Sequence, residues 1–156
     1  MVDEKPLIVP IFIPNQGCPH RCVFCDQEKI TSQPARPMDS QAVHDLLEQA
    51  RQSALFSARK HREIAFYGGT FASLPDQRIR ELLGAAAPYL QERIFHSVRV
   101  STRPDSVDEK KTALLKDLGV STVELGAQSM DDEVLNMTRR GHTGQDTERT
   151  LDLLKK

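Results

Sequence analysis

The stretch Cys18-Pro19-His20-Arg21-Cys22-Val23-Phe24-Cys25 contains all three cysteines of this 156-residue chain, spaced Cys-x3-Cys-x2-Cys. Disulfide bonding does not explain them, because three is odd and pairs so close in sequence would close strained rings. Grouped thiolates suit zinc or an iron-sulfur cluster. A structural zinc site needs a fourth protein ligand, for which His20 is the candidate, whereas a cubane held by three cysteines leaves one iron open. The stretch therefore predicts a metal or cluster site.

Mostly apolar residues precede the cysteines and indicate where this loop sits in the fold. Residues 7–14 predict a buried strand, and 15–17 predict its exit turn. The cysteines would then follow the carboxyl end of a strand, where α/β folds place their active sites.

Downstream, strand and helix patterns alternate. After a polar loop from Gln27 to Pro37, strands are predicted over 63–67, 97–102 and 121–126. Helices are predicted from Asp39 or Ser40 through Ala54, from Pro75, from a capping box at 106–109 to Gly119, from a second box at 129–132 to near Gly141, and from about Gly144 onward. This alternation indicates an α/β protein whose parallel sheet carries helices on its outer face, with right-handed connections.

Composition excludes several function classes. The net charge of -1 provides no general attraction to nucleic acid or anionic membrane. No apolar run approaches the roughly 18 residues of a membrane-spanning helix, and the acidic first residues do not resemble a signal peptide. We therefore expect a cytoplasmic protein without membrane contact, in a compartment that keeps thiols reduced.

Polar residues and glycines follow each later strand. Gly68 and Gly69 would let a ligand approach the backbone, or would simply form a turn. Arg103 precedes a proline and would extend over the sheet end. Asp105 would either cap the next helix or pair with Arg103. Glu124 would need a buried partner or form an outward salt bridge.

The cysteine motif, with the aromatic Phe24 before its last cysteine, resembles the signature of the radical S-adenosylmethionine (radical SAM) enzymes. Residues 12–20 are similar to the elongator-catalytic-subunit-like branch, a neighbour of oxygen-independent coproporphyrinogen oxidase. The segments Tyr67-Gly68-Gly69-Thr70, Ser101-Thr102-Arg103-Pro104-Asp105, Gly126-Ala127-Gln128-Ser129 and Arg140-Gly141-His142-Thr143 are similar to further motifs of the family.

This resemblance implies an oxygen-sensitive enzyme with two cofactors. Cys18, Cys22 and Cys25 would bind a [4Fe-4S] cluster, whose open iron would bind S-adenosyl-L-methionine. Reductive cleavage would then produce a 5'-deoxyadenosyl radical, with electrons from a flavodoxin- or ferredoxin-type donor, and no side chain is assigned a catalytic role. The substrate is unknown, with transfer RNA as one possibility. The alternatives are a non-catalytic zinc or iron-sulfur domain, or an inactive fragment.

The resemblance also implies roles for individual residues. Gly68 and Gly69 would hold the methionine amino group, with Thr70 in place of the family's acid. The backbone beside Phe24 would contact the adenine, Ser101 and Arg103 would lie near the cofactor, and Gln128 would face cofactor or substrate. Arg140 would bind the cofactor carboxylate, unless it is only a cation at a helix end.

The family fold is a six-unit partial β/α barrel, whereas the patterns here predict about four units. We therefore expect residues 1–156 to form a radical SAM core domain that is incomplete at its C-terminal end. A truncated gene product, a fragment or a partial gene model would each account for this length.

Overall fold

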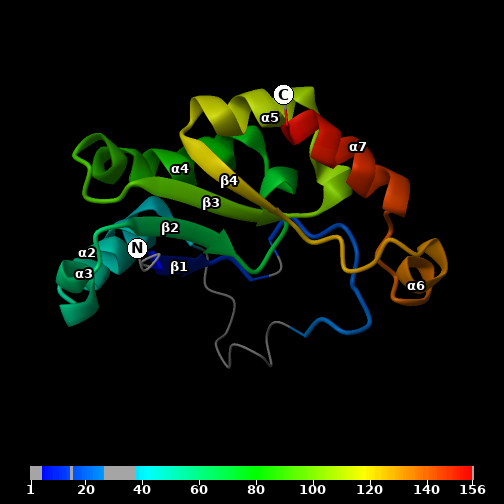
Figure 1. Ribbon diagram of the computed structural model, residues 1–156, viewed down its shortest axis with the longest axis horizontal. Helices are drawn as coiled ribbons and strands as arrows, with labels where there is room; N and C mark the ends of the chain where they lie inside the picture. The colour runs from blue at the N-terminus through cyan, green and yellow to red at the C-terminus, as the bar shows by residue number, and fades with distance from the viewer. Residues whose placement is uncertain (1–4, 15, 27–37, 156) are drawn as a thin grey trace.

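The computed structural model describes residues 5–14, 16–26 and 38–155, in which four strands form one parallel sheet. The strands follow chain order across the sheet (Figure 1): β1 (Leu7–Phe12), β2 (Arg62–Tyr67), β3 (Ser97–Thr102) and β4 (Val120–Leu125). The predicted α/β class and partial-barrel architecture are therefore confirmed. The predicted loop from Gln27 to Pro37 and Asn15 of the exit turn lie outside the described residues.

One face of the sheet is apolar and packs against helices. Ile64 of β2 stands in register with Val9 of β1 and Val98 of β3, and Phe66 with Val100 in the next layer. These side chains are buried together with apolar residues of α2 (Ser40–Arg51), α4 (Asp76–Gln91) and α5 (Glu109–Asp117). This core makes the sheet a rigid support for the loops that follow its strands.

Side chains that alternate with the apolar ones point to the other face of the sheet, where charged residues meet. Arg99 of β3 donates to Glu63 of β2, with 2.9 Å between Nη2 and Oε2, and to Glu124 of β4. The Glu63 side chain is only 5% exposed, whereas that of Glu124 is 40% exposed. Glu124 therefore forms an ion pair with a neighbouring strand, and its exposure agrees with the outward salt bridge rather than with a buried carboxylate.

The helix starts differ in part from the predicted ones. Asp39 caps α2 as expected, accepting from the N–H of Ala42 at 2.8 Å. The capping boxes predicted at Ser106 and Ser129 are wrong: Asp108 caps α5, and Asp131 caps α6 (Asp132–Met137). Ser106 lies in a 3-10 turn, η2 (Pro104–Ser106), while the Ser129 hydroxyl accepts from the N–H of Asp131.

Other helix limits also shift. Pro75 is the N-cap of α4 rather than its first residue, and Ala54 begins a separate helix, α3 (Ala54–Ala58), because the Ser53 side chain caps it. The prediction that α6 runs to near Gly141 is wrong, because the backbone turns left-handed at Arg139, with φ 55°. A second short 3-10 turn, η1 (Phe71–Ser73), follows β2.

The last helix, α7 (Gly144–Leu154), has a capping box that sequence reasoning missed, between Thr143 and Asp146. Each of these two residues binds the other's backbone or side chain, and the contact holds the pKa of Asp146 below its ordinary value. Within the described part of the chain, no helix is both long and apolar enough to cross a membrane.

Candidate functional site

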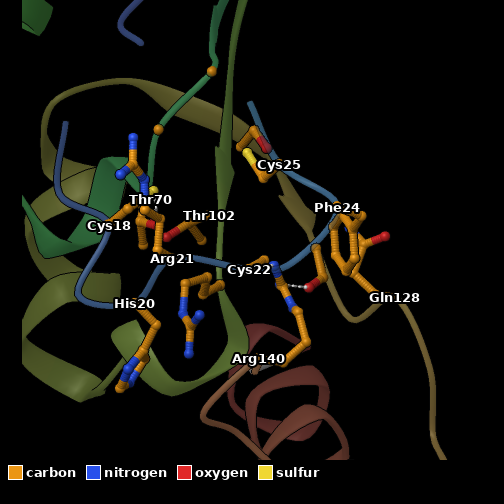
Figure 2. A pocket seen from close by; sticks show the side chains of 15 residues that line it. Cys18, His20, Arg21, Cys22, Phe24, Cys25, Thr70, Thr102, Gln128 and Arg140 are labelled. Carbon is orange, nitrogen blue, oxygen red and sulfur yellow. Dashed lines mark hydrogen bonds between the residues drawn. The ribbon is translucent and has the colours of Figure 1, made fainter. Parts of the chain in front are cut away.

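A pocket of about 220 Å³ lies at the carboxyl ends of the four strands. Every residue predicted from the sequence to bind a cluster or cofactor lines it, and Figure 2 shows most of these side chains. The members are Cys18, Cys22, Phe24, Cys25, Gly68, Gly69, Thr70, Ser101, Arg103, Gln128 and Arg140. Segments from four separate βα loops therefore meet in one place.

Four more residues line the pocket: His20, Arg21, Thr102 and Gly126. The first two lie inside the cysteine stretch, and the other two lie at strand ends. These positions in the sequence could have indicated that the four residues belong to the pocket. The hydroxyl of Thr102 also accepts a hydrogen bond from the backbone N–H of Ala72 at 3.2 Å. Thr102 thereby links the end of β3 to the turn after β2.

The first half of the cysteine loop is attached to the glycine turn after β2. The N–H of Thr70 donates to the carbonyl of Gln16 at 2.9 Å, and the Thr70 hydroxyl lies 3.3 Å from the Cys18 sulfur. A Cβ atom on Gly69 would lie 2.1 Å from the Gln16 carbonyl oxygen. Only glycine therefore allows the two loops to approach this closely.

The second half of the loop is attached to the segment after α6. The N–H of Val23 donates to the carbonyl of Thr138 at 3.2 Å, and Arg140 donates from Nη1 to the Cys22 sulfur at 3.2 Å. The Arg140 guanidinium also lies 6.0 Å from the centre of the Phe24 ring (Figure 2). Arg140 thus contacts the loop at two of the predicted site residues.

None of the three cysteines is in a disulfide, and each is at least partly accessible. They are not gathered at one point: Figure 2 shows Cys18, Cys22 and Cys25 at three separate places around the pocket. Across residues 5–14, 16–26 and 38–155, no three His, Cys, Asp or Glu side chains are grouped as a metal site. All three cysteines therefore line the pocket from separate positions.

The charge of the pocket is positive in its described lining, which contains Arg21, Arg103 and Arg140 and no Asp or Glu. Arg103 is compensated, because its Nε and Nη2 donate to the Asp105 carboxylate at 2.9 and 2.8 Å. Of the two roles considered for Asp105, the pairing is thus the one observed. Since α6 ends at Met137, Arg140 lies just beyond that helix, and its side chain donates to the Cys22 sulfur and the Gly126 carbonyl.

Arg140 is a buried cation of the pocket lining. It is 7% exposed, and the described residues include no carboxylate that pairs with it and no hydrogen-bond partner for its Nε. A buried guanidinium without an anion is unfavourable by several kcal/mol. The site is therefore suited to an anionic ligand, or to thiolates, beside Arg140.

The turn after β4 brings Gln128 to the pocket. The backbone of Gln128 is left-handed, with φ 67°, which non-glycine residues rarely adopt. The carbonyls just before it accept side-chain hydrogen bonds: Gly126 from Arg140, and Ala127 from Nε2 of His142 at 3.1 Å. His142 is 6% exposed, and sequence reasoning gave it no role of its own.

The pKa of His142 lies below its ordinary value. Burial is the main cause, and the charge of Arg140 adds to it. The imidazole is therefore neutral near pH 7, and its bond to the Ala127 carbonyl places the proton on Nε2.

Comparisons with known proteins identify the family. Residues 12–156 match the model of the radical SAM superfamily. The heme chaperone HemW of Lactococcus lactis is 28% identical over 98% of this chain and 38% of its own length. The tRNA uridine(34) acetyltransferase of Methanocaldococcus jannaschii is 28% identical over 95% of this chain and 34% of its own length.

A solved structure has a similar fold. Elp3 of Methanocaldococcus infernus, with an N-terminal deletion, superposes with a TM-score of 0.61 at 21% identity, covering 92% of this chain and 34% of the other. The chain spans about a third of the length of the relatives that it matches. Because the superfamily model covers nearly all of its residues, this chain belongs to the radical SAM superfamily.

Proposed function

We propose that the pocket binds a [4Fe-4S] cluster through Cys18, Cys22 and Cys25 and binds S-adenosyl-L-methionine beside it. The observation that carries the proposal is the convergence of the predicted site residues, from four βα loops, on one pocket. Superfamily membership supports the same assignment. The domain would then be part of a radical SAM core, acting in the cytoplasm and sensitive to oxygen.

The chemistry of the lining residues fits this pair of ligands. A cubane cluster with three thiolate ligands carries net negative charge, and the cofactor carries a carboxylate. Arg140 is buried and contacts Cys22, and its Nε has no hydrogen-bond partner among the described residues, so its guanidinium is suited to one or both anions. When bound, the two ligands supply one-electron reductive cleavage of the cofactor to methionine and a 5'-deoxyadenosyl radical.

The chain's own residues would bind and orient the cofactor. The Gly68-Gly69 backbone would present carbonyls to the ammonium group of the cofactor, and Thr70 lies beside Cys18 in the same lining. Ser101 and Arg103 would contact the cofactor from the end of β3, and Gln128 from the turn after β4. The backbone beside Phe24, whose side chain is half-exposed, would contact the adenine. No side chain here is assigned a proton-transfer step.

For the substrate we propose transfer RNA, with a flavodoxin- or ferredoxin-type protein as electron donor. The support is the relative from Methanocaldococcus jannaschii, which is named for its action on tRNA. A filter-binding assay with total tRNA over a salt series would test this part separately. Binding no tighter than that of a DNA duplex of equal charge would overturn the tRNA assignment and leave the cofactor assignment intact.

The cofactor assignment is tested by anaerobic reconstitution with iron and sulfide. Electron paramagnetic resonance of the reduced protein, with and without S-adenosyl-L-methionine, is the measurement. We expect a cubane signal that changes when the cofactor is added, and loss of the signal in Cys18→Ser, Cys22→Ser and Cys25→Ser. Ser121→Ala is the matched control, because the Ser121 hydroxyl binds the Val98 carbonyl outside the pocket.

Other outcomes would overturn the assignment. A cluster whose signal ignores the cofactor would indicate a non-catalytic iron-sulfur domain. Stoichiometric zinc with no cluster would favour the structural zinc alternative. A chain that takes up neither metal would be an inactive fragment.

A further inference from the structure

We infer that His142 is a positioning residue that, together with Arg140, holds the turn presenting Gln128 to the pocket. The inference rests on the proposed function, because it concerns how tightly the pocket binds S-adenosyl-L-methionine. His142 itself does not line the pocket, so it would act through Gln128.

The turn after β4 contains a conformation that must be held from outside. Gln128 has φ 67°, and a non-glycine residue in the left-handed region costs about 1–3 kcal/mol. Such a residue persists only where surrounding contacts determine its backbone. Within the turn, the N–H of Gly126 donates to the Thr102 carbonyl at 2.8 Å, and the N–H of Ala127 to the Leu125 carbonyl at 2.9 Å.

Two side chains from the tripeptide 140–142 contact the turn as well. Arg140 donates to the carbonyl of Gly126, and His142 donates to the carbonyl of Ala127 at 3.1 Å. Both donors are buried, at 7% and 6% exposure. Two consecutive peptide groups before Gln128 are therefore fixed by side chains that come from beyond α6.

The chemistry of His142 suits a fixed donor rather than a proton carrier. A carbonyl oxygen only accepts, so Nε2 carries the proton and Nδ1 keeps its lone pair. That Nδ1 is buried and has no hydrogen-bond partner among the described residues. The hydrogen bond that the ring makes among the described residues is therefore the one to the Ala127 carbonyl of the turn.

A double-mutant cycle separates this role from general stabilisation. The affinity of the reconstituted protein for S-adenosyl-L-methionine is measured by titration for wild type, Gln128→Ala, His142→Phe and the double variant. We expect His142→Phe to weaken binding about 3- to 10-fold in the wild-type background, the range of one hydrogen bond. In the Gln128→Ala background the same change should weaken binding less than about 2-fold.

A conservative variant and a control make the test robust to poor folding. His142→Gln keeps an amide donor toward Ala127 and should recover most of the lost affinity. Ser121→Ala removes a side chain-to-carbonyl bond outside the pocket and should leave the affinity unchanged. Iron and sulfide content, measured for each variant, shows that the cluster is equally loaded.

The possible failures are distinguishable. Equal losses from His142→Phe in both backgrounds would overturn the positioning role alone, as would a His142→Gln affinity equal to that of a well-folded His142→Phe. Absence of cofactor binding by the loaded wild-type protein would overturn the proposed function, and this inference with it.

Discussion

Arg140 donates a hydrogen bond to the sulfur of Cys22 over 3.2 Å, although 118 residues separate the two in the chain. The same guanidinium donates to the Gly126 carbonyl, in the turn after β4. One side chain therefore joins the loop after the first strand to the turn after the fourth. Because both loops line the pocket, changes at Arg140 should affect ligand binding more than they affect the fold.

Replacing Arg140 with lysine should weaken binding of S-adenosyl-L-methionine about 10- to 100-fold, since charge-assisted hydrogen bonds contribute about 1.5–3 kcal/mol. Lysine keeps the charge but not the planar fork that reaches a thiolate and a carbonyl together. Calorimetric titration of the loaded protein measures this. Arg139→Lys is the matched control, because Arg139 is exposed and outside the pocket lining. An Arg140→Lys affinity within twofold of wild type would contradict the assigned role.

Gly69→Ala should lower the free energy of unfolding by more than about 1 kcal/mol, because its Cβ would lie 2.1 Å from the Gln16 carbonyl oxygen. Gly84→Ala is the control: nothing lies within 4 Å of a Cβ there, and Gly84 is inside α4. It should raise stability by about 0.5–1 kcal/mol. Urea unfolding followed by circular dichroism measures both changes. Equal effects at the two glycines would show that the close approach of the loops is not needed.

Arg99→Met should destabilise the fold by about 3–5 kcal/mol, because it leaves the buried carboxylate of Glu63 without its partner. Glu124→Gln removes the half-exposed arm of the same ion pair and should change stability by no more than about 1 kcal/mol. Glu63→Gln combined with Arg99→Met should recover much of the loss. Urea unfolding measures the three variants. If Arg99→Met destabilises the fold no more than Glu124→Gln does, the prediction that the Arg99–Glu63 pair contributes more than the Arg99–Glu124 pair is wrong.

His142 should make stability depend on pH. Its pKa in the folded chain lies below the ordinary 6.5, because of burial and then of Arg140, with Arg103 acting in the same direction and Asp105 opposing. The unfolded chain then binds the proton more tightly, so this contribution is complete above pH 6.5 and is lost as pH falls toward the folded pKa. Unfolding free energies from pH 8 to 5 should decline more in wild type than in His142→Gln. Equal declines in wild type and in His142→Gln would contradict the contribution of His142 to this pH dependence.

The strand ends could be predicted because their signals are local. Apolar runs closed by Gly68-Gly69, by Arg103 before a proline, and by Gly126 mark where each strand stops. Parallel strands with intervening helices bring those ends to one edge of a sheet, so a site at that edge could be predicted, while resemblance to the family implied which residues would form it. The helix caps were less predictable, because several Ser and Asp residues compete within a few positions, and Asp108 and Asp131 rather than Ser106 and Ser129 occupy the N-caps.

By itself, the sequence determined the parallel α/β architecture, since periodicity and strand-end motifs are properties of short segments. Resemblance to the family implied which residues would form the site. Tertiary structure decided which distant groups meet: Arg140 with Cys22, and His142 with the Ala127 carbonyl. A side chain several residues beyond a helix can point in many directions, and only packing selects one. The left-handed Gln128 depends on such contacts, so no local pattern could have predicted it.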